Sequence, residues 1–171
     1  EKTKKLILKS KKYDLLVTSG GISKSSTDNV SKIMLTYGDL LFWRIRIKPG
    51  RPFAFGKIKD SFFIGFPGNP VAAVVTFLML VTTFIKKLSG NVDYRNEPDY
   101  LKCDFSMKKK KDRVEWLRGN FISKNKKKIV RKFHTTGSGI ISSLSKSNGI
   151  IQIDEEVEKI SRGNILKFYR Y

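Results

Sequence analysis

Cysteine and histidine are almost absent from this sequence, which has one of each, Cys103 and His134, among 171 residues. A single cysteine excludes an internal disulfide and indicates a reducing compartment, so we expect a cytoplasmic protein. A nucleophilic cysteine needs an activating histidine or a cationic setting, and His134 lies far from Cys103 along the chain. The sequence therefore predicts that Cys103 is a structural residue.

Acidic residues are also scarce, with 15 Asp and Glu against 35 Lys and Arg, which gives a formal net charge of +20. Such an excess attracts polyanions or anionic small molecules, but it can equally be a solvated coat. A basic nucleic-acid-binding module is one reading, although the basic residues are not interleaved with aromatic platforms and no recognition motif is present. Hydrophobic residues make up 40%, which indicates a globular protein and excludes a disordered one.

No signal peptide is visible, because only Leu6–Leu8 is apolar after the charged start of the chain. The apolar segment 71–85 is short for a bilayer and contains threonines, so it is interpreted as a buried helix and no membrane partner is expected. The lack of an initiating methionine indicates that upstream residues are missing.

The stretch Gly65-Phe66-Pro67-Gly68-Asn69-Pro70 is predicted to turn a strand at Phe62–Ile64 into a helix that runs to Leu88. Asn69 can cap this helix, and Pro70 suits its first position. A helix N-terminus reached through a glycine turn can bind an anion. From these residues alone, a plain strand-to-helix corner is the favoured reading.

Leu15–Thr18 is predicted to be a parallel strand buried on both faces. It ends in Ser19-Gly20-Gly21, and ligands of open α/β sheets collect at the carboxyl ends of strands. A helix is expected next, capped by either Thr27 or Asp28, with Met34 and Tyr37 on its inner face and Gly38 at its end.

Residues 41–48 alternate between apolar and cationic side chains, which predicts one strand. Leu41, Trp43, Ile45 and Ile47 share one face of this strand, and Phe42 lies on the other. Arg44, Arg46 and Lys48 share the other face. Either this is the solvated face of an edge strand, or an anion or carboxylates meet the three cations.

The second half has short strand-like runs with no sustained helical period, which predicts a small antiparallel β-barrel or sandwich. The lysine runs 108–111 and 124–128 are expected at solvated turns. The predicted fold class is thus α/β followed by all-β, with domains at residues 1–92 and 93–171.

Four blocks in this order and spacing resemble the MoeA-type molybdopterin molybdenumtransferases, the family of the gephyrin E domain. They are Tyr13-Asp14-Leu15-Leu16-Val17-Thr18-Ser19-Gly20-Gly21, Ile47-Lys48-Pro49-Gly50-Arg51-Pro52, Phe66-Pro67-Gly68-Asn69-Pro70 and Glu115-Trp116-Leu117-Arg118-Gly119. The resemblance covers nearly the whole chain. Family members are about twice this length or more, so it implies a C-terminal fragment. It also implies the end of a molybdopterin-binding α/β domain followed by the family's C-terminal β-barrel domain.

The resemblance implies an enzyme that inserts molybdenum from molybdate into adenylylated molybdopterin and releases AMP, with Mg²⁺ assisting. A homodimer and a partner enzyme of the cofactor pathway are also implied. A phosphoanhydride and an oxyanion both require positive charge and amide donors.

The resemblance assigns roles to particular residues of this chain. Arg44 and Lys48 match catalytic positions at the molybdate and phosphate site, and Asp28 matches an acidic residue suited to Mg²⁺ or to orienting water. Substrate-binding positions are matched by Ser19, Gly20, Gly21, Ser23, Arg51, Pro67, Gly68, Asn69, Pro70, Arg118 and Ser138. In the family, the last two positions reach the partner subunit's active site.

The loop between Ser23 and Asp28 departs from the family, because it lacks the usual glycine and glutamate. A lost carboxylate weakens the case for magnesium binding or turnover. A catalytically inactive remnant of the enzyme therefore remains an alternative to an active one, beside the basic binding module.

Overall fold

The computed structural model describes residues 1–23, 28–124, 127–134 and 139–171. The chain divides into two compact units. The first unit comprises Glu1–Ile45 and Gly50–Thr76, and the second comprises Arg46–Pro49 and Phe77–Tyr171. An α/β part is followed by an all-β part, as predicted. The domain boundary at residues 92 and 93 stays a prediction.

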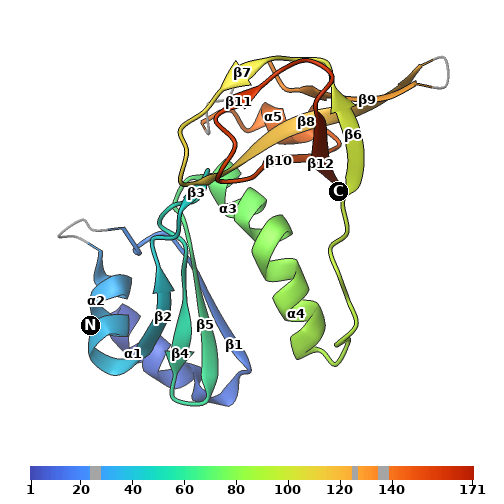
Figure 1. The fold of residues 1–171 in the computed structure, drawn as a ribbon. Coiled ribbons are helices and arrows are strands. Elements are labelled where there is room, and N and C mark those ends of the chain that lie inside the picture. Colours follow the sequence, from blue (N-terminus) through green and yellow to red (C-terminus); the bar gives the residue numbers. More distant parts are fainter. Residues whose placement is uncertain (24–27, 125–126, 135–138) are drawn as a thin grey trace. The chain divides into compact units, whose positions relative to one another are not determined.

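The first unit is a four-stranded sheet with helices against it (Figure 1). Its elements are α1 (Lys2–Leu8), the 3-10 turn η1 (Lys9–Lys12), β1 (Leu15–Ser19), α2 (Asn29–Tyr37), β2 (Asp39–Trp43), β4 (Ala54–Ile58), β5 (Ser61–Phe66) and α3 (Pro70–Thr76). The strand order is β1-β5-β4-β2, with β1 parallel to β5 and the other pairs antiparallel. The core of this unit contains Ile7, Ile22, Met34, Ala54, Ile58 and Phe63.

Strand β1 is parallel as predicted, but the expectation that both its faces are buried is wrong. It is an edge strand of the described sheet, and Val17 is 47% exposed. The helix after Asp28 is confirmed and ends at Gly38, with Met34 fully buried. Tyr37 is not on the inner face, because it lies 44% exposed and its hydroxyl accepts a hydrogen bond from Lys4 Nζ.

The predicted single strand over residues 41–48 is wrong. Strand β2 ends at Trp43, Arg44 takes a left-handed backbone angle (φ 64°), and Ile47–Lys48 forms β3 in a different sheet. An irregularity in the β2–β4 register lies between Leu40 and Phe42, and Leu41 is 59% exposed. A bulge adds one residue to a strand and so defeats strict alternation.

The second unit contains a closed barrel in which each of β10, β12, β6, β9 and β8 pairs with the next, and β8 pairs again with β10 (Figure 1). Its elements are β3 (Ile47–Lys48), the π-helical turn η2 (Phe77–Val81), α4 (Thr82–Leu88), β6 (Asp99–Cys103), β7 (Met107–Lys108), β8 (Val114–Lys124), β9 (Lys127–Lys132), α5 (Ser142–Ser145), β10 (Gly149–Ile153), β11 (Lys159–Ile160) and β12 (Ile165–Arg170). The predicted barrel is therefore confirmed, but the expectation that it is antiparallel is wrong for one pair of strands, because β6 and β9 are parallel. Cys103 lies in its core, as expected of a structural cysteine.

The lysine run 108–111 is not solvated throughout. Lys109 is 8% exposed, and its Nζ donates to the carbonyl oxygens of Lys110, Arg113 and Glu155 at 3.0, 2.8 and 3.2 Å. The side chain thus uses its three N–H donors inside the protein. The run 124–128 lies partly outside the described residues.

The long helix Pro70–Leu88 has 19 residues and a mean hydropathy of 1.9, so its length and composition would allow it to cross a membrane. The core helix of a soluble protein passes the same test. The prediction of a buried helix is right for α3, where Val71, Ala72, Val75 and Thr76 are buried. It is wrong for α4, in which no residue is buried.

Candidate active site

The glycine loop after β1 lies beside the turn after β5. The two strands are parallel neighbours, so their carboxyl ends meet at one edge of the sheet. The Gly20 amide donates to the Phe66 carbonyl at 3.0 Å, and a Cβ on Gly20 would lie 3.8 Å from the Gly68 Cα. Two predicted substrate-binding segments, residues 19–21 and 67–70, are therefore brought together.

The left-handed backbone of this loop explains its glycines. Gly20 and Gly21 have φ angles of 80° and 71°, which strain other residues. A Cβ on Gly21 would also approach Val30 Cγ2 to 2.8 Å. The Gly21 carbonyl accepts the Ser31 amide at 3.0 Å, so the loop is fastened to the start of α2.

Asp28 stands at the N-cap position of α2, but its side chain makes no cap hydrogen bond. Its carboxylate instead accepts a hydrogen bond from the Ser23 hydroxyl. These two predicted site residues therefore lie together, on either side of the undescribed residues 24–27. The capping role expected of Asp28 falls instead to backbone contacts such as the one between Ser31 and Gly21.

The turn at 67–70 is built as predicted. Asn69 Oδ1 accepts the Ala72 amide at 3.0 Å, and Pro70 begins α3. Because the Asn69 cap uses an amide of the first turn, that amide does not serve an anion. The structure thus supports the plain corner at this helix start.

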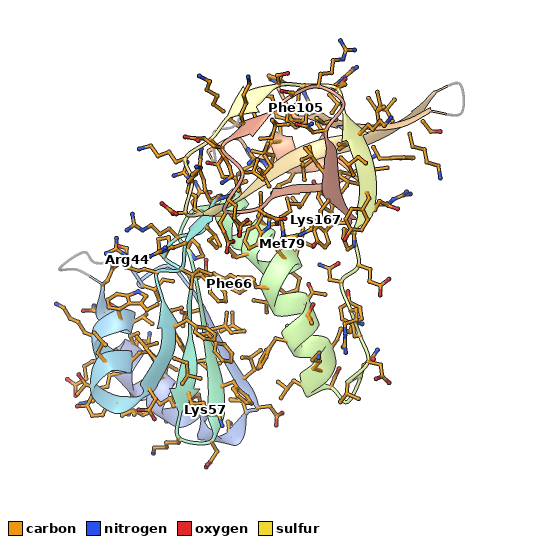
Figure 2. All side chains as sticks on the ribbon, viewed as in Figure 1. Arg44, Lys57, Phe66, Met79, Phe105 and Lys167 are labelled. Carbon is orange, nitrogen blue, oxygen red and sulfur yellow. The ribbon has the colours of Figure 1, made fainter. Side chains whose placement is uncertain are left out.

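Arg44 lies at the end of β2, as Figure 2 labels it, and its backbone amide donates to the Phe53 carbonyl at 3.1 Å. Arg51 is exposed in the turn before β4. Both belong to the first unit, whereas Lys48 belongs to the second. The cationic face expected of Arg44, Arg46 and Lys48 is therefore not formed as one strand face.

In the second unit, Lys48 lies beside a buried carboxylate. Lys48 and Glu115 are register partners of the parallel strands β3 and β8, and Lys48 Nζ lies 3.5 Å from Glu115 Oε2. Arg113 Nε donates to Glu115 Oε1 at 2.9 Å. The side chain of Glu115 is 2% exposed, against 46% for Lys48.

Sequence reasoning missed Glu115 and Arg113 as neighbours of Lys48. A signal was present, because Glu115 interrupts an apolar strand and a buried carboxylate requires a cationic partner. Arg113 stands two residues from Glu115 in the sequence, but nothing in the sequence indicates that Lys48 is a second partner. The β3–β8 pairing, which joins segments 67 residues apart, brings Lys48 there.

Arg118 is 2% exposed in β8, and its Nε donates to Ser143 Oγ at 3.0 Å. Burial lowers the pKa of its guanidinium, and the nearby Tyr171 opposes that shift. Its predicted contact with a phosphate or oxyanion stays a prediction. Ser138 lies outside the described residues.

A magnesium site would have Asp28 as its protein carboxylate. Among the described residues, no group of three or more His, Cys, Asp or Glu side chains is placed to hold a metal. Mg²⁺ often uses one or two carboxylates and takes its other oxygens from water and substrate phosphates. Asp28, with the adjacent Ser23 hydroxyl, fits that limited role.

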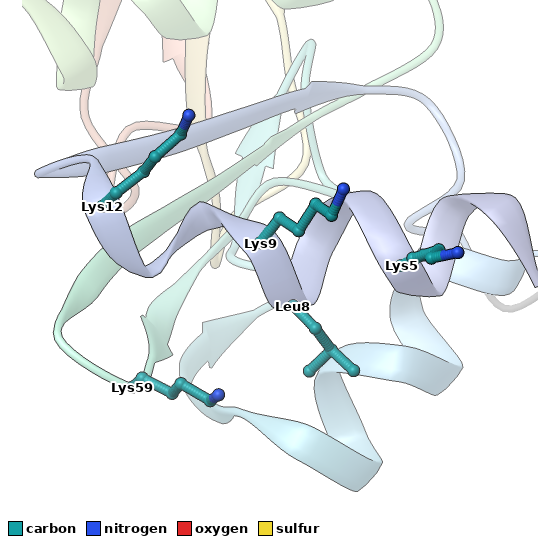
Figure 3. Close-up of a pocket in the computed structure, with 5 residues that line it drawn as sticks. All are labelled: Lys5, Leu8, Lys9, Lys12 and Lys59. Atoms are coloured by element: carbon teal, nitrogen blue, oxygen red, sulfur yellow. The ribbon is translucent and has the colours of Figure 1, made fainter.

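The largest of the hollows described for the first unit, about 540 Å³, lies away from the glycine loop (Figure 3). It is lined by Lys5, Leu8, Lys9, Lys12 and Lys59. Residues 9–12 precede β1 and Lys59 precedes β5, so this hollow lies at the amino ends of the parallel strands. The glycine loop lies at their carboxyl ends.

Comparison with known proteins agrees with this geometry. Residues 1–87 match the family described as "Probable molybdopterin binding domain", and residues 100–171 match "MoeA C-terminal region (domain IV)". The chain is 38% identical over 152 residues to a molybdopterin molybdenumtransferase of Haemophilus influenzae, covering 88% of this chain and 38% of that protein.

Solved structures give the same result. A molybdopterin biosynthesis moeA protein from Pyrococcus horikoshii has a TM-score of 0.74 and 25% identity, over 98% of this chain and 38% of that one. A molybdenum cofactor biosynthesis protein from Pyrococcus furiosus has a TM-score of 0.75 and 26% identity, over 99% of this chain and 54% of that one. The chain thus spans about two fifths of the curated relative's length. With both regions matched along the chain, the protein belongs to the MoeA family of molybdopterin molybdenumtransferases.

Proposed function

We propose that this chain acts in molybdenum cofactor biosynthesis as a molybdopterin molybdenumtransferase. Its substrates are adenylylated molybdopterin and molybdate. The reaction breaks the phosphoanhydride, releases AMP and leaves molybdenum on the dithiolene sulfurs. The observation that carries the proposal is the meeting of Gly20 and Gly68 at the carboxyl ends of β1 and β5, beside the Ser23–Asp28 pair.

The glycine loop supports binding, because residues without Cβ atoms let a ligand approach the backbone closely. Ser19, Gly20 and Gly21 contact the pterin side of the substrate, and Pro67, Gly68, Asn69 and Pro70 form the adjoining wall. Arg44, Lys48 and Arg51 supply positive charge to the phosphates and the molybdate. Arg118 and Ser138 act on the partner subunit's substrate in a homodimer.

Asp28 orients the attacking water through its carboxylate, which the Ser23 hydroxyl holds in place. Mg²⁺ held by Asp28 would neutralise charge on the substrate phosphates. The cationic side chains stabilise the negative charge that develops as the phosphoanhydride breaks.

The wider setting is part of the same proposal. Residues 1–92 form the end of the molybdopterin-binding domain and residues 93–171 the C-terminal barrel domain. The protein works in the cytoplasm as a homodimer, without membrane or nucleic acid, and receives its substrate from another enzyme of the pathway. Light scattering of the purified chain tests the homodimer.

The test is AMP release from adenylylated molybdopterin, with molybdate and Mg²⁺, by the chain and by its Asp28→Asn variant. We expect release by the parent and a loss of roughly 100-fold or more in the variant, as is typical of general acid–base groups. Asp60→Asn is the matched control, because this exposed carboxylate lies in the turn before β5, at the opposite end of the sheet. No release by a parent that unfolds cooperatively would favour the inactive remnant.

A further inference from the structure

A second hollow lies in the second unit, and of the residues that line it only Lys48 has a role in the function proposed above. It has a volume of about 410 Å³ and is lined by Lys48, Met107, Lys108, Lys109, Lys110, Arg113 and Glu115. The lining thus contains five cationic side chains and a single carboxylate. We call it the β7–β8 hollow, because most of its lining belongs to β7, to the start of β8 and to the loop between them.

Glu115 does not need both of its cations. Arg113 donates to Glu115 Oε1 through both Nε, at 2.9 Å, and Nη2, so it is the more tightly bound of the two cations. Lys48 is more loosely placed, at 3.5 Å from Oε2 and with a side chain 46% exposed. If Lys48 turned toward an anion, Arg113 would still neutralise the buried carboxylate. Lys48 is therefore a cation that the hollow can share with a ligand.

The remaining lysines differ in what they offer. Lys109 already donates to three carbonyl oxygens, so it fixes the loop and adds positive charge without a spare donor. Lys108 and Lys110 are exposed residues that line the same hollow. An entering anion can thus be met by Lys48, Lys108 and Lys110 together.

We infer that the β7–β8 hollow binds a diphosphate group, with Lys48 passing from Glu115 to the ligand. A diphosphate carries more negative charge than a single phosphate and suits several converging ammonium groups. The volume lies within the range of roughly 300–1,000 Å³ that is usual for small-molecule sites. The inference rests on the proposed function only through Lys48. The diphosphate comes either from the phosphoanhydride of the proposed substrate or from a free nucleoside diphosphate.

The test is calorimetric titration of the full 171-residue chain with inorganic pyrophosphate, comparing the double variant Lys108→Ala/Lys110→Ala with the parent. Loss of two charge-assisted contacts is expected to weaken binding at least about tenfold. Lys86→Ala/Lys87→Ala is the matched control, because it removes the same charge from exposed residues at the end of α4. Equal weakening in both double variants would mean attraction by net charge alone and would overturn the inference.

Glu115→Gln tests the sharing of Lys48. Removing the carboxylate that competes for Lys48 is expected to tighten pyrophosphate binding several-fold, whereas weaker binding by a folded variant would contradict the sharing. If Glu115→Gln does not fold, the exposed double variant still decides the site. Neither titration depends on AMP release, so failure of the proposed function would leave this result intact.

Two further arms identify the source of the diphosphate. If pyrophosphate inhibits AMP release competitively, the ligand is the substrate's phosphoanhydride. If ADP binds like pyrophosphate, AMP binds far more weakly and AMP release is unchanged by pyrophosphate, the ligand is a free nucleotide. If AMP binds as well as pyrophosphate, the preference for a diphosphate is wrong.

Discussion

The indole Nε1 of Trp43 donates a hydrogen bond to the carbonyl oxygen of Ile22, 2.8 Å away. This bond ties the end of β2 to the loop that follows Gly21, although the two residues are 21 positions apart. Ile22 is itself 2% exposed, so its carbonyl has little access to water as a replacement partner. The candidate substrate loop is thus held by a tryptophan beside Arg44.

Replacing Trp43 with phenylalanine is therefore expected to lower the free energy of unfolding by about 1–3 kcal/mol, because a buried carbonyl loses its donor. Urea unfolding followed by far-UV circular dichroism measures this. Leu41→Val is the control, since the nearby Leu41 is 59% exposed and its change should stay within about 0.5 kcal/mol. Equal effects of the two changes would contradict a stabilising role for the indole hydrogen bond.

Replacing Gly21 with alanine is expected to destabilise the protein more than replacing Gly20. In Gly20→Ala the new Cβ has room, because the nearest atom lies 3.8 Å away. The left-handed φ of 80° alone should lower the free energy of unfolding by about 1–2 kcal/mol. Gly21→Ala adds a clash with Val30 at 2.8 Å and should cost roughly 1–3 kcal/mol more. Adding Val30→Ala to Gly21→Ala should recover part of the loss. Thermal unfolding of the three variants measures these differences. A greater loss of stability in Gly20→Ala than in Gly21→Ala would contradict the geometry described for the loop.

Lys109 should matter for stability more than other lysines of its run. Lys109→Met leaves three carbonyl oxygens without their donor and is expected to cost about 2–3 kcal/mol. Lys111→Met is the comparison, because that side chain is 59% exposed in a surface ion pair with Glu158 and should change stability by about 0.5 kcal/mol or less. Urea midpoints of the two variants, followed by tryptophan fluorescence, provide the measurement. Similar midpoints would mean that the Lys109 contacts contribute little.

The barrel should lose stability in acid through Asp154. Burial raises the pKa of this carboxyl, but hydrogen bonds from Lys167 and Gln152 outweigh it and hold the pKa below its ordinary value of 3.8. A depressed pKa gives stability that is present above the unfolded value and is lost as pH falls through the folded one. The stability difference between the parent and Asp154→Asn should thus be full near pH 6 and should shrink as the pH falls below about 4.

Lys167, the partner of Asp154, determines how the stability of the barrel changes at alkaline pH. The hydrogen bond to Asp154 raises the pKa of Lys167 above its ordinary value of 10.5. Stability from a raised lysine pKa is complete below the unfolded value and is lost as pH rises through the folded one. The contribution of this pair should therefore stay constant between about pH 6 and pH 9. A difference that changes with pH in that range would contradict the assignment, and urea unfolding at several pH values measures it.

Local sequence determined the features that depend on neighbouring residues. Asn69 and Pro70 begin a helix because a short polar side chain reaches the first-turn amides and proline needs no donor there. Apolar runs separated by charged turns predicted the barrel strands. The glycines at 20 and 21 indicated a tight loop at a strand end, and the ordered motifs identified the family.

Only the tertiary structure decided which distant residues meet. Alternation over residues 41–48 predicted one strand, but Arg44 turns left-handed and Lys48 pairs with β8. Lys109 looked like a solvated charge, yet carbonyl oxygens from its own loop and from Glu155 surround it. Local patterns cannot fix such contacts, because periodicity specifies which face a side chain occupies and not what lies opposite that face. The pairing of strands far apart in the chain supplies the partner, as it does for Lys48 and Glu115.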